Sequence, residues 1–375
     1  MGHETFSVDA YRAARIKHNV TSDTHVTRHA EAEARRTGTL NYIVDPAKGP
    51  MGPVRESKIR LDPYGDKWIA TVGCPMDIEV TCDTTGSMGG EVDTEMRVLP
   101  DLYASVARML PGYDPQLSLG IFGDCEDPFV MCRPQFEMEA GKIVEYLKEM
   151  APQRGGCGNG GEDPQYAMLA RAYLTNAYTN RIGLKGYHFV VTDEPCHFEI
   201  EDRQIIRIFG EDMLENELRE IGPVRGRIQR MVKRLKEVTH QFVLVVKHHD
   251  WSYDRTQHAW EELVGTSNVI AIRSTWALPA VISAIIGLTE GTLELSNLKQ
   301  HLGEHYTEGL YFDLGALEAE QETLRSAMLH PVPKKGDIFR TKEDTWPIQP
   351  GDPDYVEVSD EISARDSSDD GIVYL

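Results

Sequence analysis

Short apolar runs alternate with amphipathic stretches through the middle of this 375-residue chain. The apolar runs are rich in β-branched residues and are bounded by Gly, Pro or Asp, which is typical of buried strands. The stretches between them repeat apolar residues every three or four positions, which predicts helices. We expect strands at 76–83, 117–124, 129–136, 187–193, 241–247 and 268–273, and helices at 92–110, 143–150, from 164, at 224–235, 257–264 and from 278.

Strands that alternate with helices predict a three-layer, Rossmann-like α/β fold, with a mainly parallel sheet between two layers of helices. The run 129–136 lies close enough to 117–124 to form a hairpin, so one edge strand should be antiparallel. The pattern divides the chain into three parts. These are an irregular N-terminal arm that packs on the main domain (1–70), the α/β domain itself (71–303), and a C-terminal extension with an acidic tail (304–375), in which 314–328 predicts one more helix.

Composition narrows the class of protein. An apolar fraction of 41% is enough for a real core, and the formal net charge of −21 argues against a nucleic-acid partner. The six cysteines are spread without tight spacings, which indicates reduced thiols in an intracellular protein. The first twenty residues contain no apolar leader segment, and the apolar run 277–288 is too short to cross a bilayer. We therefore expect a cytoplasmic protein with no membrane partner.

Oxygen-bearing side chains follow three of the expected strands. Asp83, Thr85 and Ser87 come directly after the first strand, a glycine-rich loop ends at Asp163, and Asp193 follows the fourth strand. The carboxyl ends of parallel strands meet at one edge of an open α/β sheet, where ligands bind. Carboxylate and hydroxyl oxygens suit Mg²⁺ or Mn²⁺, which keep water molecules in their remaining positions. The sequence therefore predicts a divalent cation at this edge.

Four segments resemble a known family in their order along the chain: DTTGSMGGEV, GIFGDCEDP, GGEDPQYAM and VVTDEPCH. They are similar to the metal-ion-dependent adhesion site (MIDAS) of von Willebrand factor A (vWA) domains, in the subgroup that reads DTTGSM, and the resemblance covers about 76–273. It implies a vWA fold in which Thr85 and Ser87 bind the ion directly, and Asp83 and Asp193 bind it directly or through water. Asp163 stands where most vWA domains supply a Thr.

Two departures from the family pattern leave one ligand open. Glu162 precedes Asp163, and the loop around Cys157 is longer than in the family. Either Glu162 or Asp163 is therefore the ligand from the glycine-rich loop. Asp163 also precedes Pro164, and an Asp-Pro pair is a common start of a helix, so the side chain has a purely structural interpretation as well.

The resemblance implies a binding module, not an enzyme. A Glu or Asp of a partner protein would complete the shell of the Mg²⁺ ion. The chain would act as an intracellular scaffold or as an adaptor subunit of an AAA+ ATPase. The partner could also be a second copy of the same chain. The alternative is a phosphatase similar to haloacid dehalogenases, with Asp83 as nucleophile; Thr85 stands where that family carries its second Asp.

Two further sets of residues have a functional and a structural interpretation. Thiols, imidazoles and one carboxylate near the same edge are candidate ligands for Zn²⁺ or ordinary buried and hydrogen-bonded groups: Cys125, Cys157, Cys196, His197, His248, His249 and Asp250. Basic residues in and directly after the helix at 224–235 form a solvated face or a docking strip for the acidic segment 352–370: Arg225, Arg227, Arg230, Lys233, Arg234 and Lys236. The apolar end 372–375 is a candidate docking peptide.

Overall fold

The computed structural model describes residues 8–17, 27–52, 59–61, 68–70, 74–111, 113–155, 161–181, 184–247, 250–305 and 355–356. Its central sheet has six strands: β3 (Cys74–Asp83), β4 (Tyr113–Phe122), β5 (Met131–Cys132), β6 (Gly186–Thr192), β7 (Thr239–Val246) and β8 (Val269–Ile272). The strand order is β5-β4-β3-β6-β7-β8, and all neighbours are parallel except the β4–β5 pair. The predicted parallel sheet with one antiparallel edge strand is confirmed.

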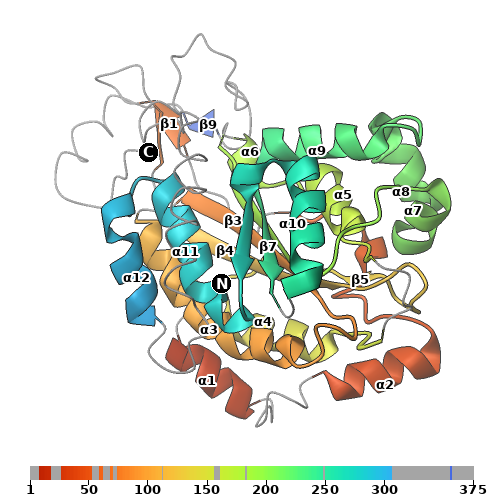
Figure 1. Cartoon of the computed structure of the whole chain (residues 1–375), viewed down its shortest axis with the longest axis horizontal. Coiled ribbons are helices and arrows are strands. Elements are labelled where there is room, and N and C mark those ends of the chain that lie inside the picture. The colour runs from red at the N-terminus through yellow and green to blue at the C-terminus, as the bar shows by residue number, and fades with distance from the viewer. Residues whose placement is uncertain are drawn as a thin grey trace.

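Helices cover both faces of the sheet and complete the predicted three-layer α/β fold (Figure 1). One apolar core includes residues of α3 (Glu91–Met109), α4 (Ala140–Glu149), α11 (Leu278–Thr289) and α12 (Leu298–His305). The other includes residues of α5 (Gln165–Tyr173), α7 (Asp202–Phe209), α9 (Arg227–Val238) and α10 (Asp250–Val264). The short helices α6 (Tyr178–Arg181) and α8 (Glu211–Asn216) lie in the connections.

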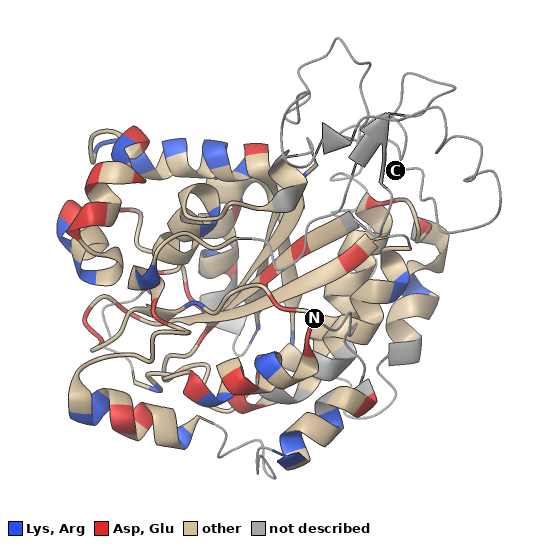
Figure 2. Cartoon of the chain, turned by 180° about the vertical axis from the view of Figure 1, so that it is seen from behind, with Lys and Arg blue, Asp and Glu red and all other residues tan. Residues whose placement is uncertain are grey.

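Alternation along the central strands explains how one sheet serves two cores. In β6, Phe189 and Val191 belong to the first core, whereas Val190 between them belongs to the second. Successive side chains of a strand point to opposite faces, so a continuous apolar run is what a doubly covered strand requires. Polar side chains alternate with apolar ones in β3, and this places acidic residues inside the sheet, visible in Figure 2 as red segments on the central strands.

The order of the strands positions the candidate site. From β3 the chain proceeds to β4 and β5 on one side, and then returns to β6, β7 and β8 on the other. The connections that follow β3 and β6 therefore leave the sheet in opposite directions. They create a gap at the carboxyl edge of the sheet, which is where doubly wound sheets bind their ligands. Asp83 ends β3 and Asp193 directly follows β6, so both lie at this gap.

The N-terminal arm is more regular than the sequence suggested. Residues 1–70 were expected to be irregular, but they contain α1 (Val8–Lys17), α2 (Arg28–Thr37) and the short strands β1 (Ile59–Leu61) and β2 (Trp68–Ala70). Both helices pack against α4, and Ala14 and Ala34 join the first core. The helices are short and strongly charged, so their apolar stripe is narrow, which is why the pattern failed to reveal them. The described helices of the arm therefore pack on the main domain.

Of the C-terminal extension, the structure describes the end of α12, which runs on to His305, and residues 355–356. The strand β9 (Tyr355–Val356) pairs in parallel with β1, in a small sheet ordered β2-β1-β9. The helix predicted at 314–328, the acidic segment apart from 355–356, and the apolar end lie outside the described residues. No described helix is both long and apolar enough to cross a membrane.

The basic helix α9 differs from the prediction at its start. Ile228, Val232 and Leu235 face inward as expected, but Val224 precedes the helix and is 45% exposed. Arg227 is buried, and its guanidinium donates to the carbonyl oxygens of Gly222 and Ile200. At least this member of the predicted basic strip therefore serves the fold. Lys233, Arg234 and Lys236 of the same helix are exposed, and Figure 2 marks the basic residues of α9 in blue.

Candidate metal centre

Asp83 is the anchor of the first loop, which connects β3 to α3. The side chain is completely buried. Its Oδ1 accepts hydrogen bonds from the backbone N of Thr85 (2.9 Å) and from Thr85 Oγ1 (2.7 Å), and its Oδ2 accepts one from Thr192 Oγ1 (2.8 Å). A short Asp side chain that accepts from the residue two positions later stabilises a tight turn. The turn brings the hydroxyls of this loop beside the carboxylate.

The same network continues to the end of β6. Thr85 Oγ1 lies 3.3 Å from Ser87 Oγ, and Ser87 Oγ donates to Asp193 Oδ1 over 2.9 Å. Asp83, Thr85, Ser87 and Asp193, four of the five predicted ligands, thus form one hydrogen-bonded group, which we call the first site. Asp83 and Thr85 are buried, whereas Ser87 is exposed, so the group opens to solvent on the Ser87 side.

Negative charge is concentrated at the first site. Burial, and then the charge of Asp193, raise the pKa of Asp83 to about 7, although its hydrogen bonds to Thr85 and Thr192 act in the opposite direction. Among the described residues, Asp83 forms no ion pair with Lys or Arg. A bound cation would relieve this charge and hold Asp83 in its ionised form.

Glu162 is the residue of the glycine-rich loop that faces the first site. It is only 7% exposed, and its Oε2 has no hydrogen-bond partner among the described residues. Burial, and then the charge of Asp83, raise its pKa to about 9, while a hydrogen bond with Thr85 lowers it. A buried carboxyl oxygen without a donor is costly in free energy, and a cation in contact with it would remove that cost.

Asp163 points into a different group. Its Oδ2 accepts from the backbone N of Cys125 over 2.6 Å. Its Oδ1 accepts from Gln165 Nε2 and lies 3.3 Å from His197 Nδ1. Glu162 and Asp163 are adjacent in the chain, but their carboxyl groups contact different residues. Of the two residues that the sequence left open, the geometry favours Glu162 as the ligand of the first site and places Asp163 beside it.

Backbone contacts hold the glycine-rich loop against the first loop. Gly86 N donates to Gly155 O, and Arg154 N donates to Thr84 O over 2.8 Å. A Cβ atom on Gly86 would lie 3.3 Å from Gly155 O, so glycine permits the close approach of the two backbones. Residues 156–160, and with them Cys157, lie outside the described residues.

Two residues that sequence reasoning missed support these loops. Arg154 has a positive φ of 52° and forms ion pairs with Glu31 of α2 (3.2 Å) and Asp93 of α3 (3.0 Å), so the N-terminal arm helps to hold the glycine-rich loop. Thr192 orients Asp83 through its hydroxyl. Thr192 lies directly before Asp193 on a strand adjacent to β3, a position from which its role could have been inferred.

The described thiols are not part of a common ligand group. Neither Cys125 nor Cys196 belongs to a group of three or more described ligand residues close enough to share an ion. Burial, and then the nearby charge of Asp163, raises the pKa of both thiols. His248 and His249, which belonged to the same hypothesis, lie outside the described residues.

Comparisons with known proteins add little. No protein-family model matches the sequence, and neither does any curated protein. The structure is similar to the pilus adhesin SpaC of Lactobacillus rhamnosus GG, with 12% identity and a TM-score of 0.36 over 67% of this chain and 34% of the adhesin. It is also similar to proximal thread matrix protein 1 of the mussel byssus, with 10% identity and a TM-score of 0.34 over 62% of this chain and 48% of that protein. Likenesses this weak carry no argument about function.

Proposed function

We propose that this protein binds one Mg²⁺ or Mn²⁺ ion at the first site and uses it to hold a carboxylate of a partner protein. Asp83, Thr85, Ser87 and Asp193 would supply oxygen ligands directly or through water, and Glu162 would supply the ligand from the glycine-rich loop. The observation that carries the proposal is the hydrogen-bonded group of hydroxyls and carboxylates at the carboxyl edge, with the unpartnered Oε2 of Glu162 beside it.

The distribution of exposure supports binding over catalysis. Asp83, the nucleophile of the phosphatase alternative, is completely buried, and both of its oxygens accept hydrogen bonds. Such a carboxylate is poorly placed to attack a phosphate ester. Ser87, in contrast, lies at the solvent-exposed side of the group, where an exchangeable water of the ion could be replaced by a ligand from outside.

The resemblance of four segments to vWA domains supports the same function and suggests two settings. In one the protein is an intracellular scaffold, and in the other it is an adaptor of an AAA+ ATPase. The partner in both would present a Glu or Asp to the ion. This step is an inference from family resemblance, since one fold serves many functions.

Mn²⁺ bound to the protein provides a direct test of the open coordination position. The ion enhances the relaxation of water protons when it retains exchangeable water. We expect acetate, a minimal carboxylate probe, to lower this relaxivity by displacing water, and acetamide, which has the same shape without the charge, to leave it unchanged. Asp83→Asn should reduce the acetate effect, because it removes the ion of the first site. An acetate effect that is equal in Asp83→Asn, or no effect in the wild type, would contradict the proposed function.

A further inference from the structure

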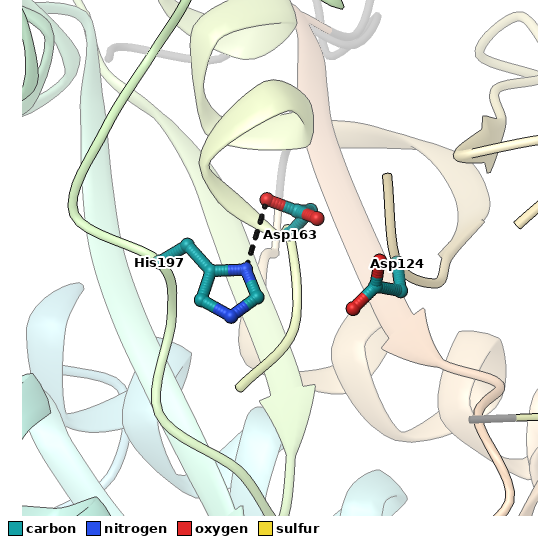
Figure 3. A group of neighbouring side chains, drawn as sticks. All are labelled: Asp124, Asp163 and His197. Carbon is teal, nitrogen blue, oxygen red and sulfur yellow. Dashed lines mark hydrogen bonds and ion pairs between the residues drawn. The ribbon is translucent and has the colours of Figure 1, made fainter. Parts of the chain in front are cut away.

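A second cluster of ligand atoms lies beside the first site. Asp124 follows β4, Asp163 precedes α5, and His197 follows β6, so three loops converge here. One ligand atom from each residue lies within 4.8 Å of the other two (Figure 3). Asp124 and Asp163 are buried, and the side chain of His197 is 36% exposed, which leaves a path from solvent.

We propose that Asp124, Asp163 and His197 form a second metal site, which binds a divalent transition-metal ion such as Mn²⁺ or Zn²⁺. An imidazole and two carboxylates form a mixed nitrogen and oxygen ligand set. Imidazole suits Zn²⁺ and other transition metals and carboxylates suit Mn²⁺, whereas Mg²⁺ prefers oxygen ligands alone, as in the first site. The second site is independent of the proposed function, because none of its three residues belongs to the first site.

The orientation of His197 fits a shared ion. Its Nδ1 faces Asp163 Oδ1 at 3.3 Å, as Figure 3 shows. Two ligand atoms at right angles around an ion, each about 2.1 Å from it, lie about 3 Å apart. The other side of the ring lies against the loop backbone, because a Cβ atom on Gly161 would approach His197 Nε2 to 2.9 Å. Only glycine allows the loop to pass this closely, and the passage keeps Nδ1 turned toward Asp163.

Backbone donors fix both carboxylates. Cys125 N donates to Asp163 Oδ2 and Glu126 N donates to Asp124 Oδ1, each over 2.6 Å. The loop that carries these donors is held in turn by Arg207, whose guanidinium donates to the carbonyl oxygens of Cys125, Asp127 and Pro128. Carboxylate ligands of metal sites are commonly oriented by such surrounding hydrogen bonds.

One buried oxygen atom next to the cluster has no hydrogen-bond partner among the described residues. The amide of Gln165 donates to Asp163 and to Glu199 O, but its Oε1 is unpartnered although the residue is completely buried. An unsatisfied buried oxygen beside the cluster indicates a bound cation or its water. Glu162, which belongs to the first site, lies close enough for the charge of Asp124 to act on its carboxyl group as well.

The competing interpretation is structural. Asp163 contacts all three loops through Cys125 N, Gln165 Nε2 and His197, and it could simply hold them together. In that case no ion would bind, and removal of the imidazole would change stability alone. The two interpretations differ in the number of bound ions and in the atoms around them, so both can be measured on the full-length protein.

Electron paramagnetic resonance of Mn²⁺ separates the alternatives. Titration should give about two bound ions per chain, and electron spin echo modulation should detect a directly bound ¹⁴N nucleus. His197→Ala should reduce the number to about one and remove the ¹⁴N signal. Asp124→Asn, which retains an acceptor for Glu126 N, should also reduce it to about one. Circular dichroism would verify that both variants fold.

A variant of the first site distinguishes a failure of the second site from a failure of the proposed function. Asp83→Ala should leave about one bound ion that retains the ¹⁴N signal, because the second site remains intact. One ion with a ¹⁴N signal in the wild type would support the second site and count against the first. Absence of the ¹⁴N signal in the wild type, or two ions in folded His197→Ala, would overturn the second site.

Discussion

The middle and the carboxyl end of β3 contain buried acidic residues in opposite environments. In the middle of the strand, Glu79 forms a bidentate ion pair with Arg133 at 2.9 and 3.0 Å, and Asp77 pairs with Arg171. At the carboxyl end, Asp83 is equally buried, but among the described residues its partners are a backbone amide and two hydroxyls. One strand thus carries carboxylates paired with arginine in its middle and a carboxylate without such a partner at its end.

The difference distinguishes carboxylates that stabilise the fold from carboxylates that are available to bind a ligand. Glu79 has its counter-charge in the chain itself. Burial raises the pKa of Glu79 and the charge of Arg133 lowers it, and the resulting pKa lies below the ordinary value. Where the described residues supply no counter-charge, the pKa of the carboxyl group rises, as at Asp83 and Glu162. Buried carboxyl groups whose pKa is raised in this way are candidate ligands for a cation from solution.

The largest expected effect on stability comes from breaking the ion pair between Glu79 and Arg133. Arg133→Met should lower the free energy of unfolding by about 3–5 kcal/mol, because it leaves the carboxylate of Glu79 buried without a partner. The double variant Glu79→Gln/Arg133→Met should recover part of that loss. Urea unfolding measures both. Equal stability of Arg133→Met and wild type would contradict a stabilising role for the Glu79–Arg133 ion pair.

The matched change at the carboxyl end of β3 should behave differently. Asp83→Asn should alter the free energy of unfolding by about 1 kcal/mol or less in metal-free buffer, since it removes a buried charge that the chain does not compensate. In the wild type, Mg²⁺ at a hundred times its Kd should add about 2.7 kcal/mol of stability, and in the variant nothing. Thermal unfolding with and without Mg²⁺ tests this. A similar gain in both proteins would contradict the assignment of Asp83.

The choice between Glu162 and Asp163 sharpens the comparison. Glu162→Gln should weaken Mg²⁺ binding about tenfold, equivalent to about 1.4 kcal/mol, because Glu162 adjoins Thr85 and Asp83. Asp163→Asn should leave Mg²⁺ affinity within about twofold. Mg²⁺ is the appropriate probe here because it disfavours the imidazole of the second site. A larger loss in Asp163→Asn, with its fold verified, would reverse the assignment.

A rise in pH should lower the stability of the metal-free protein and raise its affinity for Mg²⁺. Because the pKa values of Asp83 and Glu162 are raised to about 7 and about 9, the folded chain keeps protons that the unfolded chain releases. Their contribution to the stability of the metal-free protein is present at low pH and is lost as the pH rises through these values. Mg²⁺ affinity should instead increase over the same range, because the ion displaces those protons. Calorimetry in buffers of different ionisation enthalpy would measure the protons released; release of none would contradict the prediction.

The strand ends were predictable because they depend on local pattern. Apolar runs bounded by Asp placed Asp83 and Asp193 at one edge, and the hydrogen-bonded group follows from that placement. The orientation of Glu162 against Asp163 was not predictable, since it depends on the bridge between Glu162 and Cys196 and not on the composition of the loop. The role of Arg154 was equally hidden, because its partners Glu31 and Asp93 lie far away in the sequence.

The most direct test of the central claim is a calorimetric titration of the full-length protein with Mg²⁺, with Asp83→Ala as the matched variant. The account predicts saturable binding of about one ion per chain in the wild type and none in Asp83→Ala. Absence of binding in the wild type, or identical isotherms for the two proteins, would contradict the claim that the chain leaves this edge of the sheet for a divalent cation.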